Sequence, residues 1–108
     1  MLFRGISRHY RPHKGLSWWT PDVAHAARYC YEEDGAQIIA IEDSALKIIE
    51  CPEGIGDSWL ADSETSLWAM GLLRELGADG FRRNDAAGVA ICLLPEAVAG
   101  KVEIYEQF

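Results

Sequence analysis

The sequence predicts an α+β fold that forms a single small domain over residues 1–108. Two patterns support this prediction: several short apolar runs are separated by turn residues, and two longer segments carry apolar residues at helical spacing. In addition, 49% of the 108 residues are hydrophobic and 25% are charged, which is typical of a globular chain with one modest core. We therefore expect two short antiparallel or mixed sheets and two main helices.

The predicted strands are short, and the runs over residues 36–42 and 45–51 are rich in β-branched residues. A basic loop over residues 8–15 separates the first two strands, and residues 84–88 are typical of a hairpin turn. The expected strands cover residues 2–7, 16–19, 36–42, 45–51, 78–83, 89–94 and 101–105.

Two main helices are predicted from their end signals and apolar spacing. Thr20-Pro21-Asp22 is typical of a helix start, with Thr20 as the N-cap, and this helix is expected to run to about Glu33. The second helix is expected over residues 62–76, with Gly77 as its C-terminal stop, and one further turn over residues 95–98. The apolar stripe expected on the second helix consists of Leu67, Met70, Leu73 and Leu76.

Charge is distributed unevenly along the chain, whose formal net charge is −7. Residues 1–14 carry +4 and no acid, whereas the remaining 94 residues carry −11. An acidic body repels nucleic-acid phosphates, which argues against direct binding of DNA or RNA except through the basic N-terminal segment. The alternative interpretation is a solvated acidic surface that maintains solubility.

The cysteines and the hydropathy of the chain narrow its class further. Cys30, Cys51 and Cys92 are widely spaced and match no metal-binding spacing, so we expect reduced core thiols and no metal site. No apolar run approaches the roughly 20 residues that span a bilayer, and no signal-peptide pattern is present at the N-terminus. These features predict a soluble, cytoplasmic protein without a membrane partner.

Three short motifs follow one another in a characteristic order. Phe3-Arg4-Gly5 lies on the first strand, and Ser17-Trp18-Trp19-Thr20-Pro21-Asp22 leads from the second strand into an alanine-containing helix. Leu76-Gly77-Ala78-Asp79-Gly80 ends a later helix and passes into the predicted hairpin. In this order the motifs resemble those of the ADP-ribosyltransferase fold. In size and layout the chain looks most like the small phage-encoded members, which include an anti-CRISPR protein that modifies a host surveillance complex.

This resemblance implies a cleft that binds NAD. Arg4 would hold a ribose hydroxyl or a pyrophosphate oxygen through its planar guanidinium. Trp18 and Trp19 are adjacent on a strand, so their side chains face opposite sides: we expect one in the core and the other in the cleft against the nicotinamide. Core packing of both is the alternative. The further candidates for cofactor binding are Gly5, Ser17 and Thr20.

The resemblance also implies a catalytic carboxylate, which would stabilise the positive charge that develops on the ribose. In the family this carboxylate lies near the helix that precedes the Leu-Gly motif. The first candidate here is therefore Glu64 and the second is Asp62, and Arg4 completes the catalytic group. The alternative role for both acids is a favourable interaction with the helix dipole. Many members carry Glu on the strand that corresponds to residues 89–94, where this chain has no acid. Either Glu64, Asp62 or Asp85 replaces that residue, or the catalytic machinery is absent.

Two functions of different classes follow from these features. The first is mono-ADP-ribosylation of a protein target with NAD, in the manner of a toxin or a phage counter-defence effector. The second is a non-catalytic, anti-CRISPR-like inhibitor on the same scaffold, whose acidic body covers the basic, nucleic-acid-binding face of a partner. Hydrolysis of NAD without transfer is a third expectation.

Overall fold

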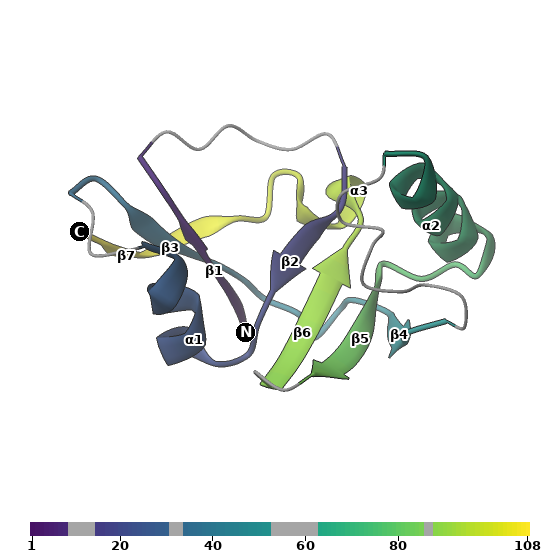
Figure 1. Ribbon diagram of the computed structural model, residues 1–108, viewed down its shortest axis with the longest axis horizontal. Coiled ribbons are helices and arrows are strands. Elements are labelled where there is room, and N and C mark those ends of the chain that lie inside the picture. Colours follow the sequence, from purple (N-terminus) through teal and green to yellow (C-terminus); the bar gives the residue numbers. More distant parts are fainter. Residues whose placement is uncertain (9–14, 31–33, 53–62, 86–87) are drawn as a thin grey trace.

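The computed structural model describes residues 1–8, 15–30, 34–52, 63–85 and 88–108 (Figure 1), and for residues 63–65 and 85 it describes the backbone only. These residues form a small α+β domain with two sheets and three α-helices, as predicted. The elements are β1 (Leu2–Ile6), β2 (Ser17–Trp19), α1 (Val23–Ala27), the 3-10 helix η1 (Arg28–Cys30), β3 (Gln37–Ile41), β4 (Ile48–Glu50), α2 (Ser63–Glu75), β5 (Gly80–Asp85), β6 (Gly88–Leu93), α3 (Pro95–Val98) and β7 (Glu103–Gln107).

The strands form one antiparallel sheet and one mixed sheet. The first sheet has the order β1-β3-β7, with antiparallel pairing throughout. The second has the order β2-β6-β5-β4, in which only β4 and β5 run parallel. β1 is therefore an edge strand of one sheet and β2 an edge strand of the other. Phe3 and Thr20 join these two edges through two backbone hydrogen bonds of 2.8 and 2.9 Å.

Side chains alternate between the two faces of each strand, and as a result the core consists of three layers of side chains. The layer between the sheets is made by side chains from both of them, and the second layer joins α2 to the opposite face of the mixed sheet. The third layer joins α1 and η1 to the outer face of the antiparallel sheet. The buried members between the sheets are Leu2, Trp19, Ile39, Ile41, Ile91 and Leu93. Two sheets stacked face to face thus lie between α1 on one side and α2 on the other (Figure 1).

The start of α1 differs from the prediction. Asp22, not Thr20, is the N-cap, and its side chain accepts a hydrogen bond of 3.0 Å from the amide of Ala24. Thr20 lies two residues earlier, where its backbone pairs with Phe3 and its hydroxyl accepts a hydrogen bond from the amide of Asp22. Pairing with β1 keeps Thr20 extended, so the helix begins only after Pro21. The α-helix ends at Ala27 and continues as η1 to Cys30, and the predicted end near Glu33 lies outside the described residues.

The predicted stop of α2 is confirmed, but its predicted stripe is only half right. Gly77 adopts φ 64°. Its amide donates a hydrogen bond to the backbone carbonyl of Arg74, and the amide of Ala78 donates one to the carbonyl of Leu73, which is the Schellman pattern. Met70 and Leu73 are buried as expected, and Ala69 joins them. Leu67 and Leu76 are 63% and 47% exposed. Leu76 lies beyond the last helical residue, and Leu67 is rotated away from the line of contact with the sheet.

The three cysteines carry no disulfide. Cys30 and Cys92 are buried, as expected of core thiols, whereas Cys51 is half-buried beside the layer that contains α2. Within the described part of the chain, no helix combines the length and apolar character that a membrane crossing requires.

Candidate functional site

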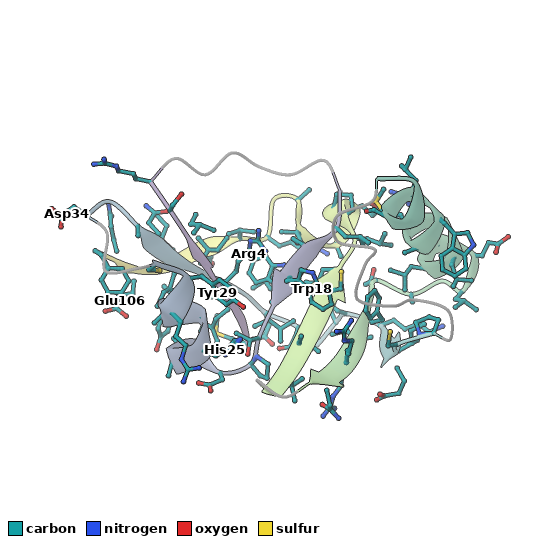
Figure 2. All side chains as sticks on the ribbon, in the orientation of Figure 1. Arg4, Trp18, His25, Tyr29, Asp34 and Glu106 are labelled. Atoms are coloured by element: carbon teal, nitrogen blue, oxygen red, sulfur yellow. The ribbon has the colours of Figure 1, made fainter. Side chains whose placement is uncertain are left out.

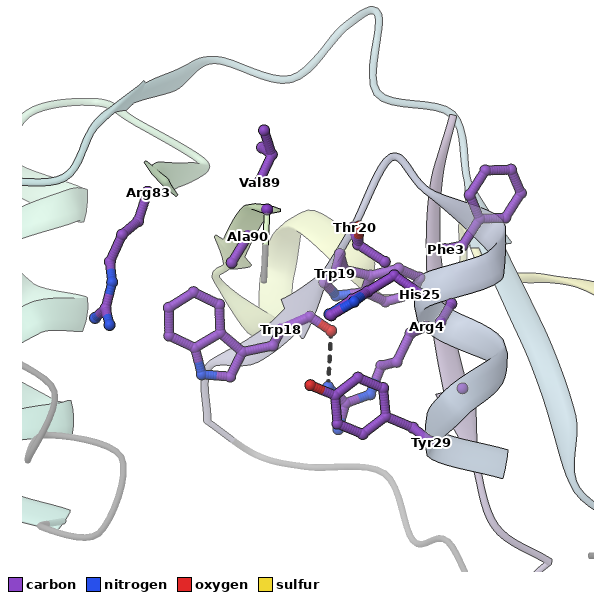
Figure 3. Close-up of a pocket in the computed structure, with 13 residues that line it drawn as sticks. Phe3, Arg4, Trp18, Trp19, Thr20, His25, Tyr29, Arg83, Val89 and Ala90 are labelled. Atoms are coloured by element: carbon purple, nitrogen blue, oxygen red, sulfur yellow. Dashed lines mark hydrogen bonds between the residues drawn. The ribbon is translucent and has the colours of Figure 1, made fainter. Parts of the chain in front are cut away.

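A pocket of about 410 Å³ lies where the edges of the two sheets meet beneath α1 (Figure 3). Four segments of the chain line it: β1, the end of β2, the α1–η1 helical segment, and the β5–β6 pair. The described lining consists of residues 3–5, 18–20 and 88–90, together with His25, Ala26, Tyr29 and Arg83.

Arg4, which the sequence analysis singled out, lines this pocket from β1. Its pairing with Ile39 places its side chain on the inner face of the antiparallel sheet, which Leu2 also uses. At this point the hydrophobic layer ends, and Nη1 of Arg4 donates a hydrogen bond of 2.8 Å to the backbone carbonyl of Trp18 (Figure 3). The guanidinium is therefore held against the neighbouring strand, where its planar fork can act as an anion-binding group.

The two tryptophans separate as strand geometry requires. Trp19 is 3% exposed in the layer between the sheets, and its Nε1 donates a hydrogen bond of 2.8 Å to the hydroxyl of Ser17. Trp18 faces the opposite side and meets Phe81 edge to face, with ring centroids 5.8 Å apart. The structure thus assigns Trp18 to the pocket and Trp19 to the core, although part of Trp19 also reaches the lining. Ser17 is buried as the partner of Trp19 and does not belong to the described lining.

Gly5 and Thr20 shape the pocket through their backbones. A Cβ atom on Gly5 would collide with the carbonyl oxygen of Ala26, so this glycine allows α1 to lie directly on β1. Thr20 holds the start of α1 through its pairing with Phe3. Both residues belong to the lining, and their evident role is to position the helix that closes one side.

Three lining side chains that can form polar contacts, those of His25, Tyr29 and Arg83, were not expected from the sequence. His25 and Tyr29 come from α1 and η1, with ring centroids 5.6 Å apart. Arg83 comes from β5, and its guanidinium carbon lies 6.0 Å from the centroid of the Trp18 ring. The four-residue spacing of His25 and Tyr29 places them on one helix face, but the sequence does not say which face borders a pocket. The alternation of Phe81 and Arg83 places both on the Trp18 face of the sheet, a signal that becomes readable only once the strand order is known.

The described lining is cationic and aromatic. It holds two arginines and one histidine, and no aspartate or glutamate is found among these residues. Cys92, which pairs with Trp18 beneath the pocket, is not an ionised nucleophile, because burial raises its pKa well above the usual thiol range despite the charge of Arg4 nearby. The site is thus suited to a ligand that has both a flat ring and negative charge.

The predicted carboxylates do not belong to the described lining. Glu64 lies in the first turn of α2, but its side chain lies outside the described residues, as does that of Asp85; Asp62 lies outside them altogether. Figure 2 shows Arg4, Trp18, His25 and Tyr29 gathered in the middle of the molecule, with α2 towards one end. The strand on which the resemblance predicts an acid contributes residues 88–90 to the pocket, none of them charged.

No group of histidine, cysteine, aspartate and glutamate side chains suited to a metal ion occurs in the described ranges. No protein-family model, curated protein or solved structure gave a significant match to this chain.

Proposed function

We propose that the pocket binds NAD and that the protein is an ADP-ribosyltransferase-like enzyme that modifies a protein target. The observation that supports this most directly is the meeting of Arg4 and Trp18, from two different sheets, in one pocket. Arg4 comes from the antiparallel sheet and Trp18 from the mixed sheet, where its indole also packs against Phe81.

The size and chemistry of the pocket suit a dinucleotide. A volume of about 410 Å³ falls within the range of roughly 300–1,000 Å³ that is usual for small-molecule sites. Guanidinium groups bind phosphate oxygens through paired N–H donors, and an indole offers a flat surface to a nicotinamide or adenine ring. Arg4 would bind the phosphates or a ribose hydroxyl, and Trp18 would hold one of the rings.

ADP-ribosyl transfer breaks the bond between nicotinamide and ribose and forms a bond from the same ribose carbon to a nucleophile of the target. Positive charge develops on the sugar, which a carboxylate stabilises. Glu64, and after it Asp62, are the residues we propose for this role. Arg4 and Trp18 would orient the substrate, because holding two reactants in place lowers the barrier without any chemical step by these residues.

A second candidate function rests on a specific observation, namely the absence of a carboxylate from the described lining. Residues 88–90 present Gly88, Val89 and Ala90 where the resemblance predicts a glutamate. On this basis the protein would bind a nucleotide or a basic partner without catalysis, in the manner of an acidic inhibitor.

Ligand-dependent thermal stability tests the binding proposal. A ligand that binds only the folded state raises the melting temperature by mass action, so millimolar NAD should stabilise the wild type more than ATP does. Arg4→Ala should abolish this shift, whereas Arg28→Ala, which removes an exposed arginine outside the described lining, should retain it. Absence of any shift with NAD in the wild type would contradict the proposal.

Release of nicotinamide then separates the two functions. An enzyme should release nicotinamide from NAD in the presence of its target, and Glu64→Gln should stop this release while the thermal shift with NAD persists. If the wild type binds NAD without releasing nicotinamide, the non-catalytic function is favoured. If reversing surface acids alone removes the biological effect, and partner binding weakens steeply with salt, the inhibitor is favoured.

A further inference from the structure

We propose that Arg83 is a second anion-binding residue of the pocket, which makes the site select ligands with two linked phosphates over ligands with one. This inference rests on the proposed nucleotide binding. It concerns a side chain that the sequence did not single out and that lies on a different strand from Arg4.

The position of Arg83 follows from the register of the mixed sheet. Arg83 pairs with Ala90 on β6, and Trp18 pairs with Cys92 two residues further along the same strand. Side chains two residues apart lie on one face of a sheet, so Arg83, Ala90 and Trp18 share the face that borders the pocket. All three line it.

Arg83 and Arg4 approach Trp18 in different ways. Arg4 holds the backbone carbonyl of Trp18 at 2.8 Å, and the guanidinium carbon of Arg83 lies 6.0 Å from the centroid of its ring. In the view of Figure 3 the indole lies between the two arginines. Both arginines thus contact Trp18 and line the same pocket.

The contact with the indole suits Arg83 to anion binding. A guanidinium near an aromatic ring is oriented by the cation–π attraction, while its N–H donors point outward along its own plane. Cys51, which Arg83 also influences, adds no charge at neutral pH, because burial raises the pKa of its thiol.

The chain offers a matched control in the adjacent residue. Arg82 lies on the same strand, faces the opposite side because strand side chains alternate, is exposed and does not belong to the described lining. Arg82→Gln and Arg83→Gln remove the same charge from neighbouring positions. A general electrostatic effect would change both variants alike, whereas a direct contact would change only the second.

Calorimetric titration with NAD, ADP, AMP and adenosine tests this inference. Loss of a charged hydrogen bond costs about 1.5–3 kcal/mol, and each 1.4 kcal/mol is about tenfold in affinity. Arg83→Gln should therefore lower the affinity for NAD and ADP by about tenfold or more and the affinity for AMP by clearly less. Arg82→Gln should leave the affinity for all four ligands nearly unchanged. Arg83→Lys should restore part of the affinity, because it keeps the charge but lacks the planar fork.

The outcomes distinguish this inference from the proposed function. If the wild type binds NAD and Arg83→Gln binds all ligands as Arg82→Gln does, the role of Arg83 is wrong and the NAD site stands. If Arg83→Gln lowers the affinity for AMP as much as the affinity for ADP, the proposed selectivity for two linked phosphates is wrong. If the wild type binds none of the nucleotides, both proposals fall. An unchanged melting temperature and circular dichroism spectrum of each variant show that a weakened affinity does not reflect loss of the fold.

Discussion

The layer between the two sheets and the pocket at its edge are built by the same strands but have opposite chemistry. In the layer, β1, β2 and β6 contribute Leu2, Trp19 and Ile91 to a cluster of buried apolar side chains. In the pocket, the same three strands contribute Arg4, Trp18 and residues 88–90.

The comparison shows how a small chain combines a stable core with a polar site. Alternation along a strand sends neighbouring side chains to opposite faces, so Trp18 and Trp19 serve two regions from adjacent positions. A substitution at one of them should therefore affect mainly stability, and a substitution at the other mainly binding.

Trp19→Ala should have the largest effect on stability. Truncation of a buried aromatic side chain costs about 3–5 kcal/mol, and Trp19 is 3% exposed in the middle of the layer. Chemical denaturation monitored by circular dichroism measures the change. Trp19→Phe should retain much of the stability, since it keeps a ring in the layer but loses the hydrogen bond to Ser17. A loss no larger than that of Trp18→Ala would contradict the assignment of Trp19 to the core.

Gly5→Ala should come next, because it changes the contact between β1 and α1 beside the pocket. The new Cβ would meet the carbonyl oxygen of Ala26, and overpacking of this kind costs about 1–3 kcal/mol. Gly71→Ala is the matched control: this helical glycine has open space around its Cβ position, so alanine there should stabilise the protein by about 0.5–1 kcal/mol. Thermal unfolding of the two variants should show shifts of opposite sign.

Trp18→Ala should separate binding from stability. Its indole packs against Phe81 but borders the pocket, so we expect a smaller loss of unfolding free energy than for Trp19→Ala. Affinity for NAD should nevertheless fall by more than tenfold, because base–aromatic stacking is worth about 1–3 kcal/mol. Trp18→Phe should recover part of that affinity. Calorimetric titration provides the measurement, and unchanged binding by Trp18→Ala would place the ligand elsewhere.

Glu96→Gln should have the smallest effect, since Glu96 is exposed and belongs neither to the layer nor to the described lining of the pocket. Glu96 on α3 accepts hydrogen bonds of 2.7 and 3.1 Å from Arg74 on α2, and this contact lowers the pKa of the carboxyl. A carboxyl whose pKa is lowered in the folded state contributes stability above its ordinary pKa and loses it as the pH falls through the folded pKa. The wild type should therefore be slightly more stable than Glu96→Gln at neutral pH, and the difference should vanish in acid. A difference that grows on acidification would contradict this sign.

Local patterns predicted most of the fold, and the errors arose where tertiary contacts decide. All seven expected strands form, because each is bounded by turn residues and carries apolar side chains for a sheet. The N-cap of α1 was placed two residues too early, since the pairing of Thr20 with Phe3 is a contact between distant segments. Leu67 was assigned to the buried stripe of α2 because the register between that helix and the sheet cannot be read from the helix alone.

Only those residues of the candidate site that belong to recognisable short motifs could be predicted from the sequence. Arg4 and Trp18 came from short motifs near the start of the chain, and the strand order brings them together. Arg83 was not predicted as a pocket residue, because an arginine on a strand cannot be distinguished from a surface charge until the neighbouring strands are known. Glu64, Asp62 and Asp85 remain predictions, as their side chains lie outside the described residues.

The double hydrogen bond between Phe3 and Thr20, together with the link from Arg4 to Trp18, fixes the width of the pocket before any ligand arrives. A site of this kind undergoes little rearrangement when it is filled, so the ordering cost is met during folding and not during association. Amide protons of Phe3 and Thr20 should accordingly exchange slowly with solvent deuterium even in the free protein. The same rigidity restricts the ligands to those whose shape fits the space that the two sheet edges leave.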